Sequence, residues 1–193
     1  MATPRKRRIW LLTGEPGSGK STALSKIVLA VKSSGYTVGG LLTREIRNRG
    51  EREGFRIVDV RTEESEILAD VKGILGPRIG KYRVNLNSLS SFAAAALENA
   101  KDHSDLLVCD EVGPMELLSP EFRKAVRAFV LQTEKPSVCV VHKRYTDPLI
   151  EELRASGEAI EQEITFENRE TVPNEAQKQI IQFLSSTQRE KST

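Results

Sequence analysis

Short apolar runs alternate with segments of helical periodicity along most of this chain. Residues 9–13 form an apolar run typical of a buried strand, and apolar side chains at helical spacing follow over residues 20–33. The same patterns predict strands over 37–46, 54–60, 105–110, 137–142 and 159–166, and helices over 88–102, 119–132, 148–155 and 174–185. Apolar strands that alternate with helices predict an α/β fold, with a mostly parallel sheet and helices on both faces.

Local signals refine this outline at three places. Gly35 is placed to end the first helix, and Ser119 followed by Pro120 is typical of an N-cap and a first helical position. Residues 47–53 are highly charged and separate two expected strands, which predicts a β-hairpin after the first helix. Residues 66–85 contain several glycines and predict only short strand-like pieces.

Length and charge limit the classes of protein to which this chain can belong. The chain has 193 residues, which favours one domain, and 29 Lys and Arg against 27 Asp and Glu give a net charge of only +2. This balance argues against a protein dominated by phosphate-backbone binding, although it does not exclude nucleic acid. We expect residues 1–8 to form a flexible basic arm, residues 9–185 the folded domain and residues 186–193 a polar tail.

The cellular setting is predicted from features that the sequence lacks. Its two cysteines, Cys109 and Cys139, fall in apolar strands and do not make a disulfide framework. No apolar run approaches the roughly 18 residues of a membrane span, and the N-terminus lacks the features of a signal peptide. We therefore expect a cytoplasmic monomer with no membrane contact.

A glycine-rich turn between the first strand and the first helix matches G-x-x-x-x-G-K-[ST], the phosphate-loop or Walker A pattern. Its glycines let successive backbone N–H groups point at phosphate, and the helix presents its N-terminus to the same anion. Lys20 supplies a positive charge for the β and γ phosphates, and the Ser21 hydroxyl is a ligand suited to Mg²⁺. The predicted nucleotide-binding residues here are Gly14, Glu15, Pro16, Gly17, Ser18, Gly19, Lys20, Ser21 and Thr22.

An Asp–Glu pair closes the apolar strand over residues 105–110. We expect Asp110 at the carboxyl end of that strand, level with the phosphate loop, where it can hold Mg²⁺ through a water as the Walker B acid. Glu111 can orient and deprotonate a water for in-line attack on the γ phosphorus, which favours hydrolysis over phosphotransfer. Asp110 through Gly113 also match the D-x-x-G of GTPase switches, but no Asn-Lys-x-Asp or Thr-Lys-x-Asp follows to read guanine.

Several stretches beyond the phosphate loop match one family closely. They are Val38-Gly39-Gly40-Leu41-Leu42-Thr43 with Glu45 and Arg47, Gly54-Phe55 with Ile57 and Asp59, Gly80-Lys81-Tyr82 with Val84, Asp110 through Leu117, and Thr165 with Asn168-Arg169. Over about residues 9–184 the chain resembles the small thermophile-type nucleoside-triphosphatases, known in animals as cancer-related nucleoside-triphosphatase. The resemblance implies a RecA-like P-loop sheet and Mg²⁺-dependent hydrolysis of many nucleoside triphosphates. Pro114-Met115-Glu116 is its most specific part.

Other polar residues could contact the nucleotide. Basic side chains can neutralise charge in the transition state, and we favour Arg47, Lys81 and Arg144 among candidates that also include Arg44 and Arg52. His142 ends a strand and could polarise the γ phosphate or make a structural hydrogen bond. Asn168 and Arg169 follow the last strand, where they could contact the nucleobase or ribose or form a connecting loop.

The sequence thus predicts an enzyme, a Mg²⁺-dependent nucleoside-triphosphatase that acts on ATP, GTP, CTP and UTP with weak base selectivity. Weak selectivity is expected because the phosphate-loop contacts go to groups that all these substrates share. Two alternatives stay open. One is a nucleotide or polynucleotide kinase, an activity also discussed for the family, and the other is a binding module whose slow hydrolysis resets a partner-controlled switch.

Overall fold

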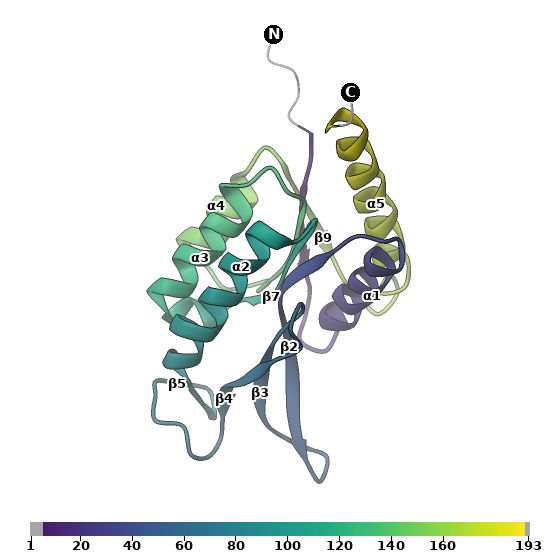
Figure 1. The fold of residues 1–193 in the computed structure, drawn as a ribbon. Coiled ribbons are helices and arrows are strands. Elements are labelled where there is room, and N and C mark those ends of the chain that lie inside the picture. Colours follow the sequence, from purple (N-terminus) through teal and green to yellow (C-terminus); the bar gives the residue numbers. More distant parts are fainter. Residues whose placement is uncertain (1–5, 192–193) are drawn as a thin grey trace.

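The computed structural model describes residues 6–191, which form one mixed sheet with helices on both faces (Figure 1). Within these residues the sheet has nine strands in the order β5-β6-β4-β3-β2-β7-β8-β1-β9. The strands are β1 (Ile9–Thr13), β2 (Val38–Asn48), β3 (Glu51–Asp59), β4 (Ser65–Asp70), β5 (Arg78–Ile79), β6 (Tyr82–Val84), β7 (Leu106–Val112), β8 (Ser137–Val141) and β9 (Ala159–Glu163). The helices are α1 (Lys20–Ser33), α2 (Ala94–His103), α3 (Pro120–Leu131), α4 (Pro148–Ala155) and α5 (Thr171–Lys191), with a π-helical turn at Ser88–Ala93 and a 3₁₀ turn at Glu116–Leu118.

One half of the sheet is parallel, as the alternation of strands and helices predicts. In spatial order β2, β7, β8, β1 and β9 pair in parallel. β8 lies between β1 and β7, so one strand separates the strand before the glycine-rich turn from the strand that carries Asp110 and Glu111. Because parallel strands end at the same edge of a sheet, the turn and the acidic pair come to one edge. The predicted α/β fold class is confirmed.

The other half of the sheet is antiparallel and grows from the predicted hairpin. β2 and β3 pair as far as Asn48 and Glu51, so the charged residues 47–53 continue the strands except at the turn itself. A two-residue turn is enough because Arg49 and Gly50 both have positive φ, 49° and 86°. β4, β6 and β5 extend this half and account for half of the segment that the sequence left undefined.

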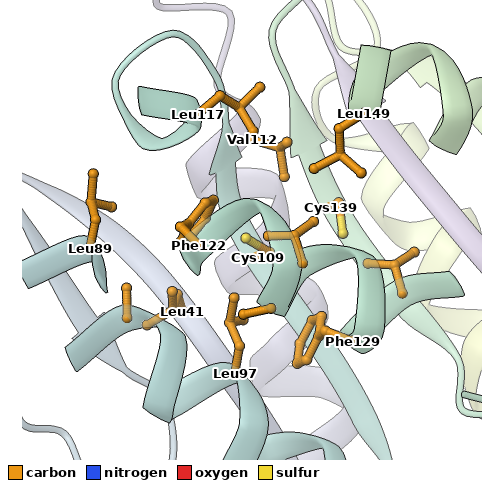
Figure 2. Close-up of a cluster of buried hydrophobic side chains, with 14 of the residues drawn as sticks. Leu41, Leu89, Leu97, Cys109, Val112, Leu117, Phe122, Phe129, Cys139 and Leu149 are labelled. Carbon is orange, nitrogen blue, oxygen red and sulfur yellow. The ribbon is translucent and has the colours of Figure 1, made fainter. Parts of the chain in front are cut away.

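Two hydrophobic clusters, one on each face of the sheet, hold the layers together. On one face Leu41, Cys109 and Cys139 pack beneath α2, α3 and α4, as Figure 2 shows. On the other face Leu12 and Val108 pack with residues of α1 and α5. Figure 1 shows these two helices together on one side of the sheet. Neighbouring residues of one strand face opposite layers, as the alternation of side chains along a strand requires. Both cysteines are buried and free.

The two ends differ from the expected arm and tail. Arg8 is buried, and its guanidinium donates to the Val130 carbonyl at 2.9 Å and pairs with Glu158 at 2.7 Å. α5 runs to Lys191, so residues 186–191 continue a helix that was expected to end at residue 185. No Gly or Pro interrupts that stretch, which gives the helix no reason to stop. The predictions for residues 1–5 and 192–193 lie outside the described residues.

Side-chain hydrogen bonds set two element boundaries. Ser119 caps α3 as predicted, because its hydroxyl accepts the Phe122 N–H at 3.2 Å. β9 ends at Glu163 and not at residue 166, because the Asn168 amide donates to the Glu163 carbonyl at 2.8 Å and closes a turn. None of the helices within residues 6–191 combines the length and apolar character needed to cross a bilayer.

Candidate active site

The glycine-rich turn joins β1 to α1 and lies against the segment that follows β9. A Cβ on Gly14 would lie 2.4 Å from the Ile164 carbonyl oxygen, and Gly14 has a φ of +148°. Only glycine fits this close approach. The Ser18 N–H donates to the Glu15 carbonyl at 3.1 Å and closes the loop. The turn therefore has the compact shape that lets backbone N–H groups converge on an anion.

Lys20, the first residue of α1, folds back over this turn. Its Nζ donates to the Gly14 and Glu15 carbonyls at 3.1 and 3.0 Å. These two bonds hold the ammonium group above the loop, where the sequence pattern predicts the β and γ phosphates. Lys20 is therefore positioned by its own loop and not by a distant partner.

Asp110 lies at the end of β7, next to the first turn of α1. Its side chain is buried, and burial raises the pKa of Asp110 to about 6, against the opposing effect of a hydrogen bond with Ser21. Asp110 Oδ2 is buried and finds no hydrogen-bond partner among the described residues. An orphaned carboxylate oxygen beside a hydroxyl is a donor set that suits Mg²⁺, so these residues fit the ion that the sequence predicts.

Glu111 follows Asp110 and is partly buried. Burial raises the pKa of Glu111 above its ordinary value, and the charge of Lys20 opposes this shift. A Cβ on Gly113 would lie 2.8 Å from Glu111 Oε1, so the glycine leaves room for this carboxylate. A carboxylate whose pKa is raised binds a proton more readily than an ordinary glutamate, as a general base requires.

One cavity of about 680 Å³ joins the phosphate loop to the acidic pair. Asp110, Glu111 and every predicted loop residue except the buried Ser18 line it. A second part of its wall comes from the antiparallel half of the sheet and the segment after β7, with Thr43, Glu45, Arg52, Phe55, Leu68, Ile79, Pro114, Met115 and Glu116. The cavity is thus polar and charged at the phosphate loop, and beyond the acidic pair its wall mixes apolar with charged side chains.

Two basic side chains reach this cavity from the loop after β8. Arg144 forms an ion pair with Glu15 of the phosphate loop at 2.7 Å, and Lys143 pairs with the same carboxylate at 3.2 Å. These hydrogen bonds lower the pKa of Glu15. The sequence pointed to Arg144 but missed Lys143, whose neighbouring position was the available signal.

The two other predicted charge-stabilising residues lie outside the cavity lining. Arg47 is near the hairpin tip, where it pairs with Glu45 and donates to the Gly50 carbonyl at 2.9 Å. The ammonium group of Lys81 lies 5.4 Å from the centre of the Tyr82 ring. Arg52 does line the cavity, although the sequence had favoured Arg47 and Lys81 over it.

His142 makes the structural hydrogen bonds that were one of its two predicted roles, and its contact with the γ phosphate stays a prediction. Its Nδ1 accepts the backbone N–H groups of Arg144 and Tyr145 at 3.3 and 3.0 Å, so the neutral ring carries its proton on Nε2. Burial lowers the pKa of His142, and the charge of Lys20 acts in the same direction. The ring also lines the cavity, where a neutral imidazole is a hydrogen-bond donor.

Asn168 and Arg169 lie outside the cavity, on the loop between β9 and α5. The Asn168 amide is engaged within the loop, since Oδ1 accepts the Thr165 N–H at 2.8 Å and Nδ2 donates to Glu163. Arg169 lies beside the phosphate loop, with its Cβ and Cδ 3.8 Å from where a Cβ of Gly19 would be. Its guanidinium is 5.9 Å from the ring centre of Phe166, an exposed residue that was not among the predicted site residues.

Glu116 is a buried carboxyl at the cavity wall, and the sequence alone indicated no role for it beyond its place in the family-like stretch. It is only 6% exposed, and burial, followed by the charge of Glu111, raises the pKa of Glu116 to about 8. The signal was an acidic residue within an otherwise apolar turn. Glu116 therefore stays protonated at neutral pH and can donate a hydrogen bond.

Replacing Glu116 by glutamine should stabilise the protein above pH 5. As pH rises from about 4.5 to about 8, an unfolded Glu116 loses its proton while the folded one keeps it, so the parent loses stability over this interval. Glutamine does not ionise, so the Glu116→Gln gain in melting temperature should grow with pH. At pH 8 it should be at least about 2 °C, the shift expected for about 1 kcal/mol in a domain of this size. A gain of equal size at pH 4.5 and pH 8, measured by thermal unfolding, would contradict the assignment.

A phosphate loop after a parallel strand, with an acidic pair on a second parallel strand separated from it by one strand and a cavity shared by both, is the arrangement of the P-loop nucleoside-triphosphatases. The particular family follows from the sequence itself. It matches the NTPase family over residues 9–177, and the chain belongs to that family.

Relatives and solved structures agree with this assignment. The chain is 42% identical to the nucleoside-triphosphatase THEP1 of Methanosarcina acetivorans, over 90% of this chain and 97% of that protein. The crystal structure of THEP1 from Aquifex aeolicus is similar with a TM-score of 0.76 and 31% identity, over 87% of this chain and 96% of that one. The solution structure of a human cancer-related nucleoside triphosphatase has a TM-score of 0.74 and 33% identity, over 93% and 98%. The resemblance found from sequence motifs is confirmed.

Proposed function

We propose that this nucleoside-triphosphatase hydrolyses ATP, GTP, CTP and UTP to the diphosphate and phosphate, in a Mg²⁺-dependent reaction with weak base selectivity. The observation that carries the proposal is the shared cavity, in which the phosphate loop meets the orphaned Oδ2 of Asp110 and the carboxylate of Glu111. The names of the relatives support the general activity. A cytoplasmic location and a monomeric state complete the proposal and rest on the sequence alone.

The phosphate loop binds and orients the triphosphate. Its backbone N–H groups and the N-terminus of α1 face the anion, and Lys20 exchanges two carbonyl partners for the β and γ phosphates. Ser21 and Asp110 would hold Mg²⁺, which when bound draws charge from the phosphate oxygens. Arg144 and Lys143 enter from the loop after β8, and His142 offers its Nε2–H to the same region.

Glu111 acts as the general base. It takes a proton from a water as the water oxygen bonds to the γ phosphorus. The bond from that phosphorus to the β–γ bridging oxygen breaks, and its electron pair leaves with the diphosphate. The raised pKa of Glu111 suits this step, because the carboxylate holds the abstracted proton more strongly than an exposed glutamate would.

Initial rates of hydrolysis test the proposal directly. With Mg²⁺, rates for ATP, GTP, CTP and UTP should lie within about one to two decades of one another, because one good base contact discriminates by only about 1–3 kcal/mol. Removal of the metal with EDTA should abolish phosphate release for all of them. Activity confined to one nucleotide, or undiminished activity in EDTA, would overturn the proposal.

A nucleotide or polynucleotide kinase is the second candidate, and the cavity supplies an observation in its favour. The cavity continues beyond the acidic pair, where Phe55, Leu68, Ile79 and Met115 line it together with charged side chains such as Arg52 and Glu45. A hydrolase needs space only for a water, whereas a kinase needs a compartment for an acceptor. Product analysis with ATP, in the presence and absence of nucleosides or oligonucleotides, separates the two, since a kinase transfers phosphate to the acceptor.

A further inference from the structure

The proposed function gives the nucleotide a direction in this site. It requires the γ phosphate to lie toward Asp110 and Glu111 on β7, which lies on one side of β1 in the sheet. On the other side of β1 is β9, and the loop after β9 runs beside the phosphate loop, since the Ile164 N–H donates to the Thr13 carbonyl at 2.7 Å. A triphosphate laid along the phosphate loop therefore turns its nucleoside toward the loop after β9.

That loop carries two neighbouring side chains with planar groups, Phe166 and Arg169. Phe166 is 66% exposed and belongs to neither hydrophobic cluster, and the Arg169 guanidinium lies 5.9 Å from its ring centre. The aliphatic part of Arg169 reaches to within 3.8 Å of a Cβ placed on Gly19, at the start of α1. Arg169 thus lies next to the phosphate loop with Phe166 near its guanidinium, and neither residue lines the cavity that holds the acidic residues.

Hydrogen bonds fix the backbone of the loop that carries Phe166 and Arg169. The Asn168 side chain bonds to Thr165 and Glu163, and its carbonyl accepts the Thr171 and Val172 N–H groups at 2.9 and 3.0 Å. Asn168 is therefore a positioning residue, and its amide is already engaged when a base arrives. A loop held in this way loses little conformational entropy on binding.

We propose that Phe166 and Arg169 form the nucleobase platform of this enzyme, on which the base stacks face-on without having its edge read. This inference rests on the proposed function and deepens it, because it accounts for the weak base selectivity. Every base has a π-face, so an aromatic ring and a guanidinium plane accept purines and pyrimidines alike. A ligand that has the phosphates but no base would not use the platform.

Equilibrium binding tests the platform with two kinds of ligand. Calorimetry in EDTA, where turnover is prevented, compares ATP, GTP, CTP and UTP with inorganic tripolyphosphate, which lacks a base. Phe166→Ala should weaken all four nucleotides by about 5- to 150-fold, the loss that corresponds to about 1–3 kcal/mol of base stacking. Tripolyphosphate should bind the variant within about twofold of the parent. Leu75→Ala, at a 97% exposed position away from the site, is the matched control. It should change neither the affinity for the nucleotides nor the affinity for tripolyphosphate.

Further variants separate stacking from a loss of structure. Phe166→Trp should retain nucleotide affinity, and the fluorescence of the new indole should be quenched by ATP but not by tripolyphosphate. Arg169→Leu should also lower affinity for all four nucleotides. The proposal is overturned if Phe166→Ala leaves nucleotide affinity unchanged, weakens tripolyphosphate equally, or affects one base alone. If tripolyphosphate fails to bind the parent, the phosphate-loop assignment fails, and the platform fails with it.

Discussion

Replacing Glu111 by glutamine should lower kcat by at least about 100-fold while nucleotide affinity stays close to that of the parent. A positioned general base contributes about 10²–10⁴-fold, and glutamine keeps the size and hydrogen bonding of glutamate but does not accept the proton. The phosphate loop and Asp110 are untouched, so the triphosphate should still bind. Steady-state kinetics and equilibrium binding on the same preparation measure the two quantities.

The pH dependence of kcat distinguishes the loss of a general base from a structural defect. Glu111 must be ionised to accept a proton, and burial holds its pKa above the ordinary value. The parent should therefore lose kcat as pH falls through this raised pKa. That loss should be missing from the residual activity of Glu111→Gln.

Asp110→Asn is the matched comparison, because it changes the neighbouring carboxyl in the same way. It removes charge from the group expected to hold Mg²⁺, so the metal concentration needed for half activity should rise. A magnesium titration of both variants shows whether Asp110→Asn changes the metal requirement while Glu111→Gln changes kcat. If Glu111→Gln hydrolyses ATP within a few fold of the parent, Glu111 is not the base and the kinase alternative gains support.

Replacing Lys20 by alanine should weaken triphosphate binding by more than tenfold with almost no change in melting temperature. Among the described residues the ammonium group donates its hydrogen bonds to two carbonyls of its own loop, so its removal breaks no hydrogen bond to a distant segment there. It does remove the positive charge that faces the β and γ phosphates.

Calorimetry with ATP and thermal unfolding without nucleotide measure these two effects. Lys124→Ala, at an exposed position on α3, removes one positive charge away from the cavity and controls for net charge. Parent-like ATP hydrolysis by Lys20→Ala would mean that the phosphate-loop assignment is wrong.

Features that depend on a few consecutive residues could be predicted from the sequence. The phosphate-loop turn needs glycines at set positions and a strand and a helix on either side, all within one short segment. The Ser119 cap of α3 needs only the Phe122 N–H three residues away. Glu116 was visible as an acid in an apolar turn, but its raised pKa depends on burial and on Glu111, which no local pattern reports.

The sequence predictions were wrong where contacts with distant segments decide the local structure. The charged residues 47–53 have a loop-like composition, yet the partner strand and a two-residue turn keep most of them in β2 and β3. Arg8 was assigned to a solvated arm because its neighbours are basic, but Glu158 and the Val130 carbonyl hold it in the fold. Spacing along the chain gave no information about these partners.

By itself the sequence determined the α/β class, the phosphate loop, the Asp110–Glu111 pair and the family, because each depends on local residue order or on motifs. Only the tertiary structure decided which distant side chains meet them. The order of strands sets β8 between β1 and β7, and this brings Arg144 and Lys143 to Glu15 while Arg47 stays near the hairpin tip. The same order places Arg169 beside the phosphate loop on its other side, with Phe166 near its guanidinium. These pairings join residues far apart in the chain, and strand order, which local patterns do not encode, is what sets the distance between them.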